Sequence, residues 1–250
     1  MTSKLEIRGL NRSFDGVPVL KDLSLDVAEG EFVSILGPSG SGKSTTFSVL
    51  TGALSPTSGE VRVDGRLLSE SPGRFAFMPQ KDALLPWRKV IDNLTLGLEV
   101  AGMRRKEARR KVEPLLETFG LAGYEHSHPA QLSGGMRQRA ALLRTVVQDR
   151  EVLLLDEPFG ALDALTRARM QQWLERVREE YRWTVLLITH DVREAVFLSD
   201  RVYVFSPRPA TVVECVEVGL PRPRTVDAYA DPAFTRIENE LLRTLLEEEK

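Results

Sequence analysis

Hydrophobic and polar residues alternate along the first part of the chain. The apolar positions that recur in this pattern are Leu5, Ile7, Phe14, Val17, Val19, Leu23, Leu25 and Val27. A period close to two is typical of half-buried strands. Because Asn11, Gly16 and Gly30 lie at the interruptions, the pattern predicts short strands separated by turns.

The chain then changes from a strand pattern to a helix pattern across a glycine-rich stretch. Residues 32–36 are almost continuously apolar, which predicts a buried strand. Residues 43–50 contain no glycine or proline and suit a helix. Residues 61–63 and 74–78 are further strand candidates.

A helical period dominates the middle of the chain. Residues 103–119 and 137–147 carry apolar side chains three and four positions apart, which predicts helices there. The region from residue 87 to residue 147 is therefore expected to be a mostly helical insertion.

Strand and helix signals alternate in the next part. Strands are predicted at residues 151–155, 184–189 and 202–205, and helices at residues 165–181 and 192–199. This order predicts an α/β fold with a mainly parallel sheet that is covered on both faces. Several prolines follow Pro207, and a last helix is predicted at residues 232–249, so we expect the tail to be an appendage.

Composition narrows the class of protein. Of the 250 residues, 42% are hydrophobic and 28% are charged, as in ordinary globular domains. The formal net charge of -2 gives no overall reason to expect a nucleic-acid partner. The single cysteine, Cys215, excludes an internal disulfide and favours a reducing compartment such as the cytoplasm. We expect no membrane span and no export signal, because every apolar run is far shorter than the roughly 20 residues that cross a bilayer.

The strongest chemical motif lies between the predicted strand at 32–36 and the helix that follows it. It consists of Gly37, Pro38, Ser39, Gly40, Ser41, Gly42, Lys43 and Ser44. A loop of this composition directs backbone N–H groups at phosphate oxygens, and the start of the helix adds a partial positive charge. Lys43 is expected to neutralise the terminal phosphates and Ser44 to bind magnesium. The alternative is a glycine-rich turn that binds nothing.

A second motif is the pair Asp156 and Glu157, which follows the apolar strand at 151–155. Ligands collect at the carboxyl ends of parallel strands. Asp156 is therefore expected to hold the magnesium shell, and Glu157 to polarise the attacking water. Two such acids could instead be solvated loop residues.

A third motif, residues 132–139, contains Ser133, Gly134 and Gly135 directly before a predicted helix. Ser133 and the following backbone could form a second anion-binding helix start, or only a helix cap. With this motif the sequence resembles the ATP-binding cassette (ABC) family over roughly residues 4–205. The resemblance implies a head-to-tail homodimer with two ATP molecules at its interface. Each serine motif would then contact the γ-phosphate on the opposite subunit.

The resemblance also implies a role for individual residues. Catalytic roles fall on Lys43, Gln80, Glu157 and His190; nucleotide binding falls on Phe14, Gly37, Pro38, Ser39, Gly40, Ser41, Gly42, Lys43, Ser44, Thr45, Ser133, Gly134, Gly135 and Asp163; magnesium coordination falls on Ser44, Gln80 and Asp156. Phe14 would stack on adenine, His190 would bond the γ-phosphate, and Asp163 would contact the other subunit. Each role has an alternative. Phe14 could be a core residue and His190 an ordinary histidine at the end of a strand. Asp163 could be only a helix cap, and Gln80 a plain surface residue.

In fold terms the resemblance implies a P-loop NTPase (RecA-like) core with an N-terminal antiparallel β subdomain and an inserted α-helical signature subdomain. The ATPase domain is expected at residues 1–206. Its core would comprise residues 1–86 and 148–206, and its helical subdomain residues 87–147. A C-terminal extension would follow at residues 207–250.

The resemblance is strongest to ATPase subunits of importers for nitrate, alkanesulfonates, taurine or thiamine-precursor pyrimidines. Residues 82–87, which end in Trp87, lie where such subunits receive a helix of the permease, although these residues could be local core. Expected partners are therefore transmembrane permease subunits and, indirectly, a solute-binding protein, at the cytoplasmic face of the inner membrane. The rival class is a soluble ABC-type ATPase that acts on a cytosolic complex.

Overall fold

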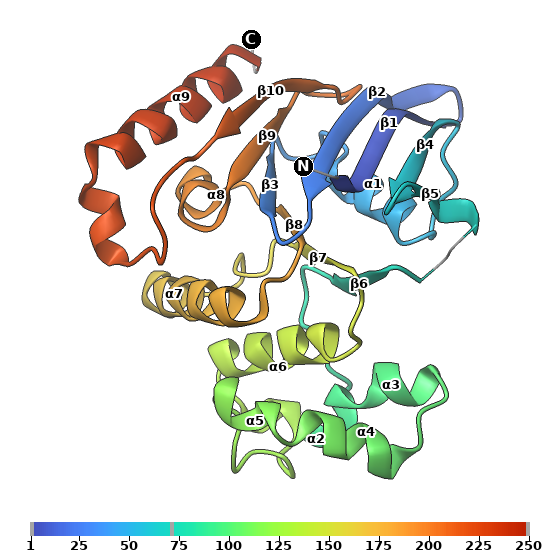
Figure 1. Ribbon diagram of the computed structural model, residues 1–250, viewed down its shortest axis with the longest axis vertical. Coiled ribbons are helices and arrows are strands. Elements are labelled where there is room, and N and C mark those ends of the chain that lie inside the picture. Colours follow the sequence, from blue (N-terminus) through green and yellow to red (C-terminus); the bar gives the residue numbers. More distant parts are fainter. Residues whose placement is uncertain (1–2, 71–72, 249–250) are drawn as a thin grey trace.

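Two sheets form the centre of the molecule in the computed structural model, which describes residues 3–70 and 73–248 (Figure 1). The larger sheet has six strands in the order β10-β9-β3-β8-β7-β6. Its strands are β3 (Phe32–Leu36), β6 (Phe75–Met78), β7 (Val152–Asp156), β8 (Val185–Ile188), β9 (Arg201–Phe205) and β10 (Val212–Glu217). All neighbours pair in parallel except β9 and β10, which pair antiparallel. The predicted mainly parallel α/β sheet is confirmed.

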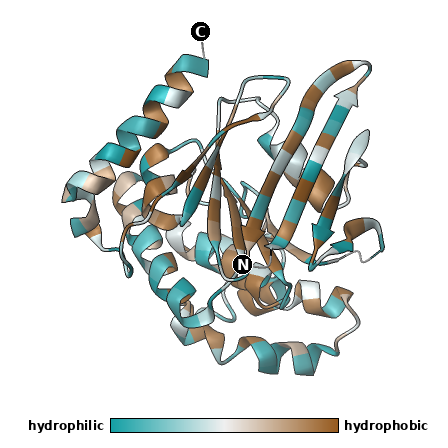
Figure 2. Ribbon diagram, turned by 45° about the horizontal axis from the view of Figure 1, so that its top comes forward, coloured by the Kyte–Doolittle hydropathy of each residue, from teal (hydrophilic) through white to brown (hydrophobic). Residues whose placement is uncertain are grey.

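The inner strands are apolar throughout because both faces of the sheet are buried. On β3, Phe32 and Leu36 join one hydrophobic core together with the helices, whereas Val33 and Ile35 join a second core on the opposite face. The second core also contains apolar residues of helix α1 (Lys43–Leu50) and of the N-terminal strands. Figure 2 shows these hydrophobic strands at the centre of the fold.

The N-terminal sheet has the strand order β2-β1-β4-β5. Its members are β1 (Ser3–Phe14), β2 (Val17–Ala28), β4 (Ser58–Val63) and β5 (Arg66–Leu67). The prediction of several short strands was wrong, because β1 and β2 each run for 12 residues. Asn11 does not end β1; the pairing of β1 with β2 instead absorbs irregular positions as register shifts.

A helical region lies at one end of the molecule, beyond β6 and β7 (Figure 1). Its helices are α2 (Val90–Leu94), α3 (Leu96–Val100), α4 (Arg105–Val112), α5 (Leu115–Thr118) and α6 (Gly134–Val146). A short 3-10 turn at Pro129–Gln131 precedes α6, and two others lie outside this region, at Leu68–Glu70 and Val226–Ala230. The helical pattern predicted for residues 103–119 is interrupted between α4 and α5. Pro114 lies at this break and has no N–H to continue the helix.

Three further helices pack on the face of the large sheet to which Phe32 and Leu36 belong: α7 (Ala164–Tyr181), α8 (Val192–Leu198) and α9 (Pro232–Glu248). Helix α9 packs on α8 and crosses beside β10 (Figure 1). The predicted end of the last helix at residue 249 lies outside the described residues.

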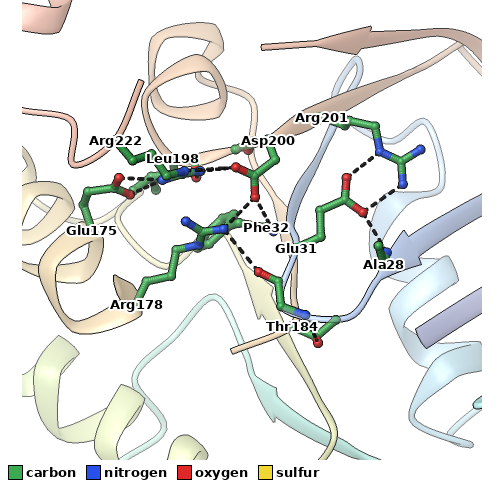
Figure 3. A network of polar contacts seen from close by, with 12 residues as sticks. Ala28, Glu31, Phe32, Glu175, Arg178, Thr184, Leu198, Asp200, Arg201 and Arg222 are labelled. Carbon is green, nitrogen blue, oxygen red and sulfur yellow. Dashed lines mark hydrogen bonds and ion pairs between the residues drawn. The ribbon is translucent and has the colours of Figure 1, made fainter. Parts of the chain in front are cut away.

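The segment after residue 206 is built into the fold, so the expected appendage was wrong in this respect. Strand β10, which the pattern did not predict, extends the large sheet. Arg222 pairs with the buried Glu175 of α7 and with Asp200, and it donates to the carbonyl of Leu198 at 2.7 Å (Figure 3). Arg178 of α7 donates to the same Asp200 at 2.6 Å. These ion pairs join α7, β9 and the C-terminal segment.

Within residues 3–70 and 73–248, no helix has the length and apolar character needed to cross a membrane.

Candidate functional site

The glycine-rich loop connects the end of β3 to the start of α1, as the sequence predicts. Gly42 has a φ of 123°, and a Cβ there would lie 2.8 Å from the Leu20 side chain, so this position requires glycine. Lys43 is buried and folds back over the loop, where its Nζ donates to the carbonyls of Gly37 at 2.7 Å and Pro38 at 2.8 Å. Among the described residues, the buried Ser41 hydroxyl has no hydrogen-bond partner. The loop therefore contains both the buried ammonium group of Lys43 and the unpaired hydroxyl of Ser41.

The charges near this loop perturb each other. Burial lowers the pKa of Lys43, whereas the carboxylates of Glu157 and Asp156 act in the opposite direction. Burial and the neighbouring Glu157 raise the pKa of Asp156, and the hydroxyl of Ser44 and the charge of Lys43 oppose this rise. A bound cation would relieve the cost of placing two half-buried carboxylates side by side. Hydroxyl, carboxylate and amide oxygens are ligands that magnesium prefers, so Ser44, Asp156 and Gln80 form a suitable donor set.

Two predicted catalytic side chains, Gln80 and His190, meet a third, Glu157. The amide of Gln80, after β6, donates to Glu157 Oε2 at 2.8 Å. His190 Nδ1, after β8, lies 3.3 Å from the same oxygen. Glu157 itself has a φ of 44° and donates its backbone N–H to the carbonyl of Ile188 at 2.8 Å. Because β6, β7 and β8 are parallel neighbours, their carboxyl ends bring these residues together at one edge of the sheet.

The residues that surround His190 were not predicted from the sequence. Asp191 caps α8 by accepting from the N–H of Glu194 at 3.1 Å, and it also pairs with Arg167 of α7 at 3.3 Å. A cavity of about 10 Å³ is lined by Glu157, Gly160, Arg167, Thr189, His190, Asp191 and Glu194. The spacing of Asp191 and Glu194 at the helix start resembles a capping box, which was the available signal.

Ser133 and Asp163 form a second group. Ser133 caps α6 by accepting from the N–H of Met136 at 3.2 Å, and Asp163 caps α7 by accepting from the N–H of Thr166 at 3.0 Å. A Cβ on Gly135 would lie 3.0 Å from Thr166, so the two helix starts approach closely. Both capping side chains are exposed. Within the described part of the chain, no hydrogen bond joins Ser133 to the glycine-rich loop.

Phe14 and Trp87 are both exposed. The Phe14 ring is 39% exposed, and the guanidinium of Arg12 lies 4.6 Å from its centre. The alternative of a core phenylalanine is therefore wrong. Trp87 is 72% exposed, whereas Leu84 nearby is buried. In residues 82–87, the segment expected to meet a permease, Leu84 therefore belongs to the core and Trp87 faces outward.

Comparisons with known proteins agree with this arrangement. The family described as "ABC transporter" matches residues 20–160. The chain is 43% identical over 210 residues to the taurine import ATP-binding protein TauB of Yersinia pestis, which covers 84% of this chain and 82% of the relative. It is 44% identical over 245 residues to the aliphatic sulfonates import ATP-binding protein SsuB of Delftia acidovorans, with 98% and 95% covered.

A solved structure supports the same conclusion. The ATP-binding cassette MJ0796, in a dimeric post-hydrolysis state bound to ADP and Pi, superposes with a TM-score of 0.74 at 28% identity. The match covers 87% of this chain and 100% of that one. The chain therefore belongs to the ABC transporter family, as one of its ATP-binding ATPases.

Proposed function

We propose that this chain is the ATP-hydrolysing subunit of a bacterial ABC importer that drives a separate permease. The observation that carries the proposal is the meeting of Gln80, Glu157 and His190 beside the phosphate-binding loop. Glu157 is fixed by its backbone bond to Ile188 and by Gln80, and its side chain remains 20% exposed, so water can reach it. The rest of the chemistry follows from this placement.

Hydrolysis is phosphoryl transfer to water. Glu157 orients the water and accepts its proton as oxygen bonds to the γ-phosphorus and the bond to ADP breaks, which leaves ADP and inorganic phosphate. His190 donates to a γ-phosphate oxygen, and Lys43 exchanges its two loop carbonyls for phosphate oxygens. Ser44, Asp156 and Gln80 would hold Mg²⁺, which neutralises the phosphate charge when bound.

The remaining site residues contact the nucleotide around this centre. The loop residues 37–42 and Thr45 cradle the phosphates, and the exposed Phe14 stacks on adenine. Ser133, Gly134, Gly135 and Asp163 are proposed to act on the nucleotide of a second copy, in a head-to-tail homodimer. The exposure of Ser133 and Asp163 supports that assignment, as does the absence, within the described residues, of a hydrogen bond from Ser133 to the glycine-rich loop of the same chain.

Relatives named for taurine and aliphatic sulfonates support the import of a small anion such as nitrate, an alkanesulfonate or taurine, with a pyrimidine precursor as a further option. The exposed Trp87 offers an aromatic anchor for the permease. The protein would then sit peripherally on the cytoplasmic face of the inner membrane, and a solute-binding protein would deliver the cargo to the permease.

The first experiment tests hydrolysis with Glu157→Gln. Because this change removes the proton acceptor and keeps the shape, ATP turnover should fall at least about 100-fold. ATP should convert the variant to a stable dimer in size-exclusion chromatography with light scattering. Glu180→Gln, an exposed acid on α7, is the matched control and should behave as wild type. Unchanged turnover by the Glu157 variant would refute the assigned role.

The second experiment tests the transport assignment. The tagged Glu157→Gln protein is recovered from solubilised membranes of its own host, and co-purifying proteins are identified by mass spectrometry. A multi-span permease should be recovered with the protein but lost with Trp87→Ala, whereas Val100→Ala, at another exposed apolar residue, should keep it. Recovery of cytosolic proteins alone would favour the soluble ABC-type ATPase instead.

A further inference from the structure

The loop that carries His190 is fixed by the residues on either side of it. Thr189, directly before His190, accepts the backbone N–H of Asp191 at 3.1 Å through its hydroxyl. Asp191, directly after His190, accepts the backbone N–H of Glu194 at 3.1 Å. The His190 ring itself is 62% exposed, and Glu157 is its ion-pair partner in the described structure. The orientation of the ring therefore depends on its sequence neighbours.

Glu194 lies directly beneath this loop. Glu194 is 4% exposed, and its Oε2 accepts from the amide of Gln171 on α7 at 3.1 Å. Its other carboxyl oxygen, Oε1, is buried and has no hydrogen-bond partner among the described residues. Glu194 lines the small cavity of about 10 Å³ that Glu157 and His190 also line. The assigned chemistry does not use this buried acid.

The C-terminal segment reaches the same carboxyl group through one intermediate side chain. Tyr229 donates its hydroxyl to Gln171 Oε1 at 3.3 Å. Because the carbonyl end of the Gln171 amide accepts from Tyr229, its NH₂ end is directed at Glu194. The Tyr229 ring stacks on Phe197 of α8 with centroids 5.2 Å apart, so the tyrosine is held against the helix that follows His190.

The groups around Glu194 come from several elements. Arg167 on α7 is a cation, Asp191 caps α8, and Glu157 and His190 line the shared cavity. Burial raises the pKa of Glu194 to about 7; the nearby Asp191 adds to this rise, whereas Thr189, Gln171 and Arg167 oppose it. Burial also raises the pKa of Tyr229 to about 12, so its hydroxyl remains a donor at neutral pH.

We propose that Glu194 is a positioning residue for His190, and that Gln171 of α7, itself held by Tyr229 of the C-terminal segment, keeps Glu194 in the orientation needed for this role. The proposal rests on the proposed ATPase role of His190. When ionised, Glu194 has two acceptor oxygens: Oε2 accepts from Gln171, and the unpaired Oε1 is available to accept from the neighbouring Thr189 hydroxyl. Thr189, the residue before His190, is then held in place by the buried carboxylate of Glu194. A protonated carboxyl loses one of these acceptors.

The main test compares wild type with Glu194→Gln in steady-state ATP hydrolysis by the purified full chain from pH 6 to pH 8. The amide keeps the size of the carboxyl and stays neutral. An acid with a pKa near 7 is about 10% ionised at pH 6 and about 90% at pH 8. The ratio of wild-type to variant kcat should therefore rise with pH over this range, by at most about ninefold, while KM for ATP stays within about twofold.

The second test uses Tyr229→Phe, which keeps the stacked ring and removes the hydroxyl. It should lower kcat about threefold with an unchanged KM, as expected for one lost neutral hydrogen bond. Tyr181→Phe removes a hydroxyl at the end of α7 and should have no effect. Glu238→Gln is a further control, since Glu238 pairs with Arg193 on the outer side of α8 at 3.5 Å.

The outcomes separate this proposal from the proposed function. If His190→Ala hydrolyses ATP like wild type, the role assigned to His190 is wrong and this inference fails with it. If His190→Ala is slow but Glu194→Gln and Tyr229→Phe match wild type at every pH, only the inference is overturned. A pH-independent loss of kcat in Glu194→Gln, equal at pH 6 and pH 8, would show a purely structural role and would also overturn it.

Discussion

The two ends of helix α8 are held in different ways. At its carboxyl end, Arg224 is 4% exposed and donates to the carbonyls of Val196, Phe197 and Ser199 at 2.7 to 3.0 Å. At its amino end, Asp191 and Glu194 are held by side chains of Thr189, Arg167 and Gln171, and the adjoining His190 ring is mostly exposed. The carboxyl end is fixed by the buried guanidinium of Arg224, whereas at the amino end the exposed His190 ring has only Glu157 as a partner among the described residues and can turn toward a ligand.

This contrast suggests a division of work along one short helix. Buried charge-assisted hydrogen bonds are strong and costly to break, so the C-terminal segment provides a rigid base. The catalytic end is less restrained, as is common for residues that must respond to substrate. Changes at the carboxyl end should therefore affect stability, and changes at the amino end should affect turnover.

The largest expected effect is on stability, at Arg222. Arg222→Met would leave the Glu175 carboxylate, whose side chain is 1% exposed, without its guanidinium partner. Removing one member of a buried ion pair typically costs about 3–5 kcal/mol. Denaturant unfolding should show this loss, while kcat per folded molecule stays near wild type. The double variant Glu175→Gln with Arg222→Met should recover much of the loss; an equal or greater loss would argue against the pairing.

A smaller effect, on catalysis alone, is expected at His190. His190→Ala should lower kcat about 100-fold, equivalent to about 2.7 kcal/mol of transition-state stabilisation. The melting temperature should not change, because the ring is mostly exposed. His126→Ala, in an exposed loop, is the matched control. A marked drop in melting temperature for His190→Ala would contradict the division between the two ends.

Stability should also depend on pH through Glu194. Burial raises its pKa from the ordinary 4.5 to about 7, so between these values the folded chain binds more protons than the unfolded chain. The free energy of unfolding from this group therefore falls as pH rises, by at most about 1.4 kcal/mol per pH unit, and is constant below and above that window. Glu194→Gln should show a flatter dependence between pH 5 and pH 7. Parallel curves for the two proteins would exclude the shift.

The smallest effect is expected on the outer face of α8. Arg193 and Glu238 pair at 3.5 Å, and the Arg193 side chain is 55% exposed. Exposed ion pairs contribute less than about 1 kcal/mol, so Glu238→Gln should change stability only slightly. Its kcat should equal that of wild type. A loss comparable with that of Arg222→Met would mean that α9 carries more of the anchoring than its contacts indicate.

The sequence alone determined the local parts of the site. The glycine-rich loop, the apolar strand that ends at Asp156 and the serine that caps α6 all depend on a few adjacent residues, and backbone preferences act at that range. The parallel sheet also followed from the order of strand and helix patterns. The roles assigned to the individual site residues stay predictions.

Only the tertiary structure decided which distant residues meet. Gln80 and His190 reach Glu157 from separate strands, and Arg222 reaches Glu175 across 47 residues of chain. Strand β10 escaped prediction because its residues are mostly exposed or half-buried and give a weak pattern. The buried role of Glu194 was equally hidden, since a glutamate near a helix start reads as a solvated cap. The burial of a side chain and the identity of its partner depend on how whole helices and strands pack. The pattern of neighbouring residues in the sequence therefore cannot show which distant residue a side chain contacts.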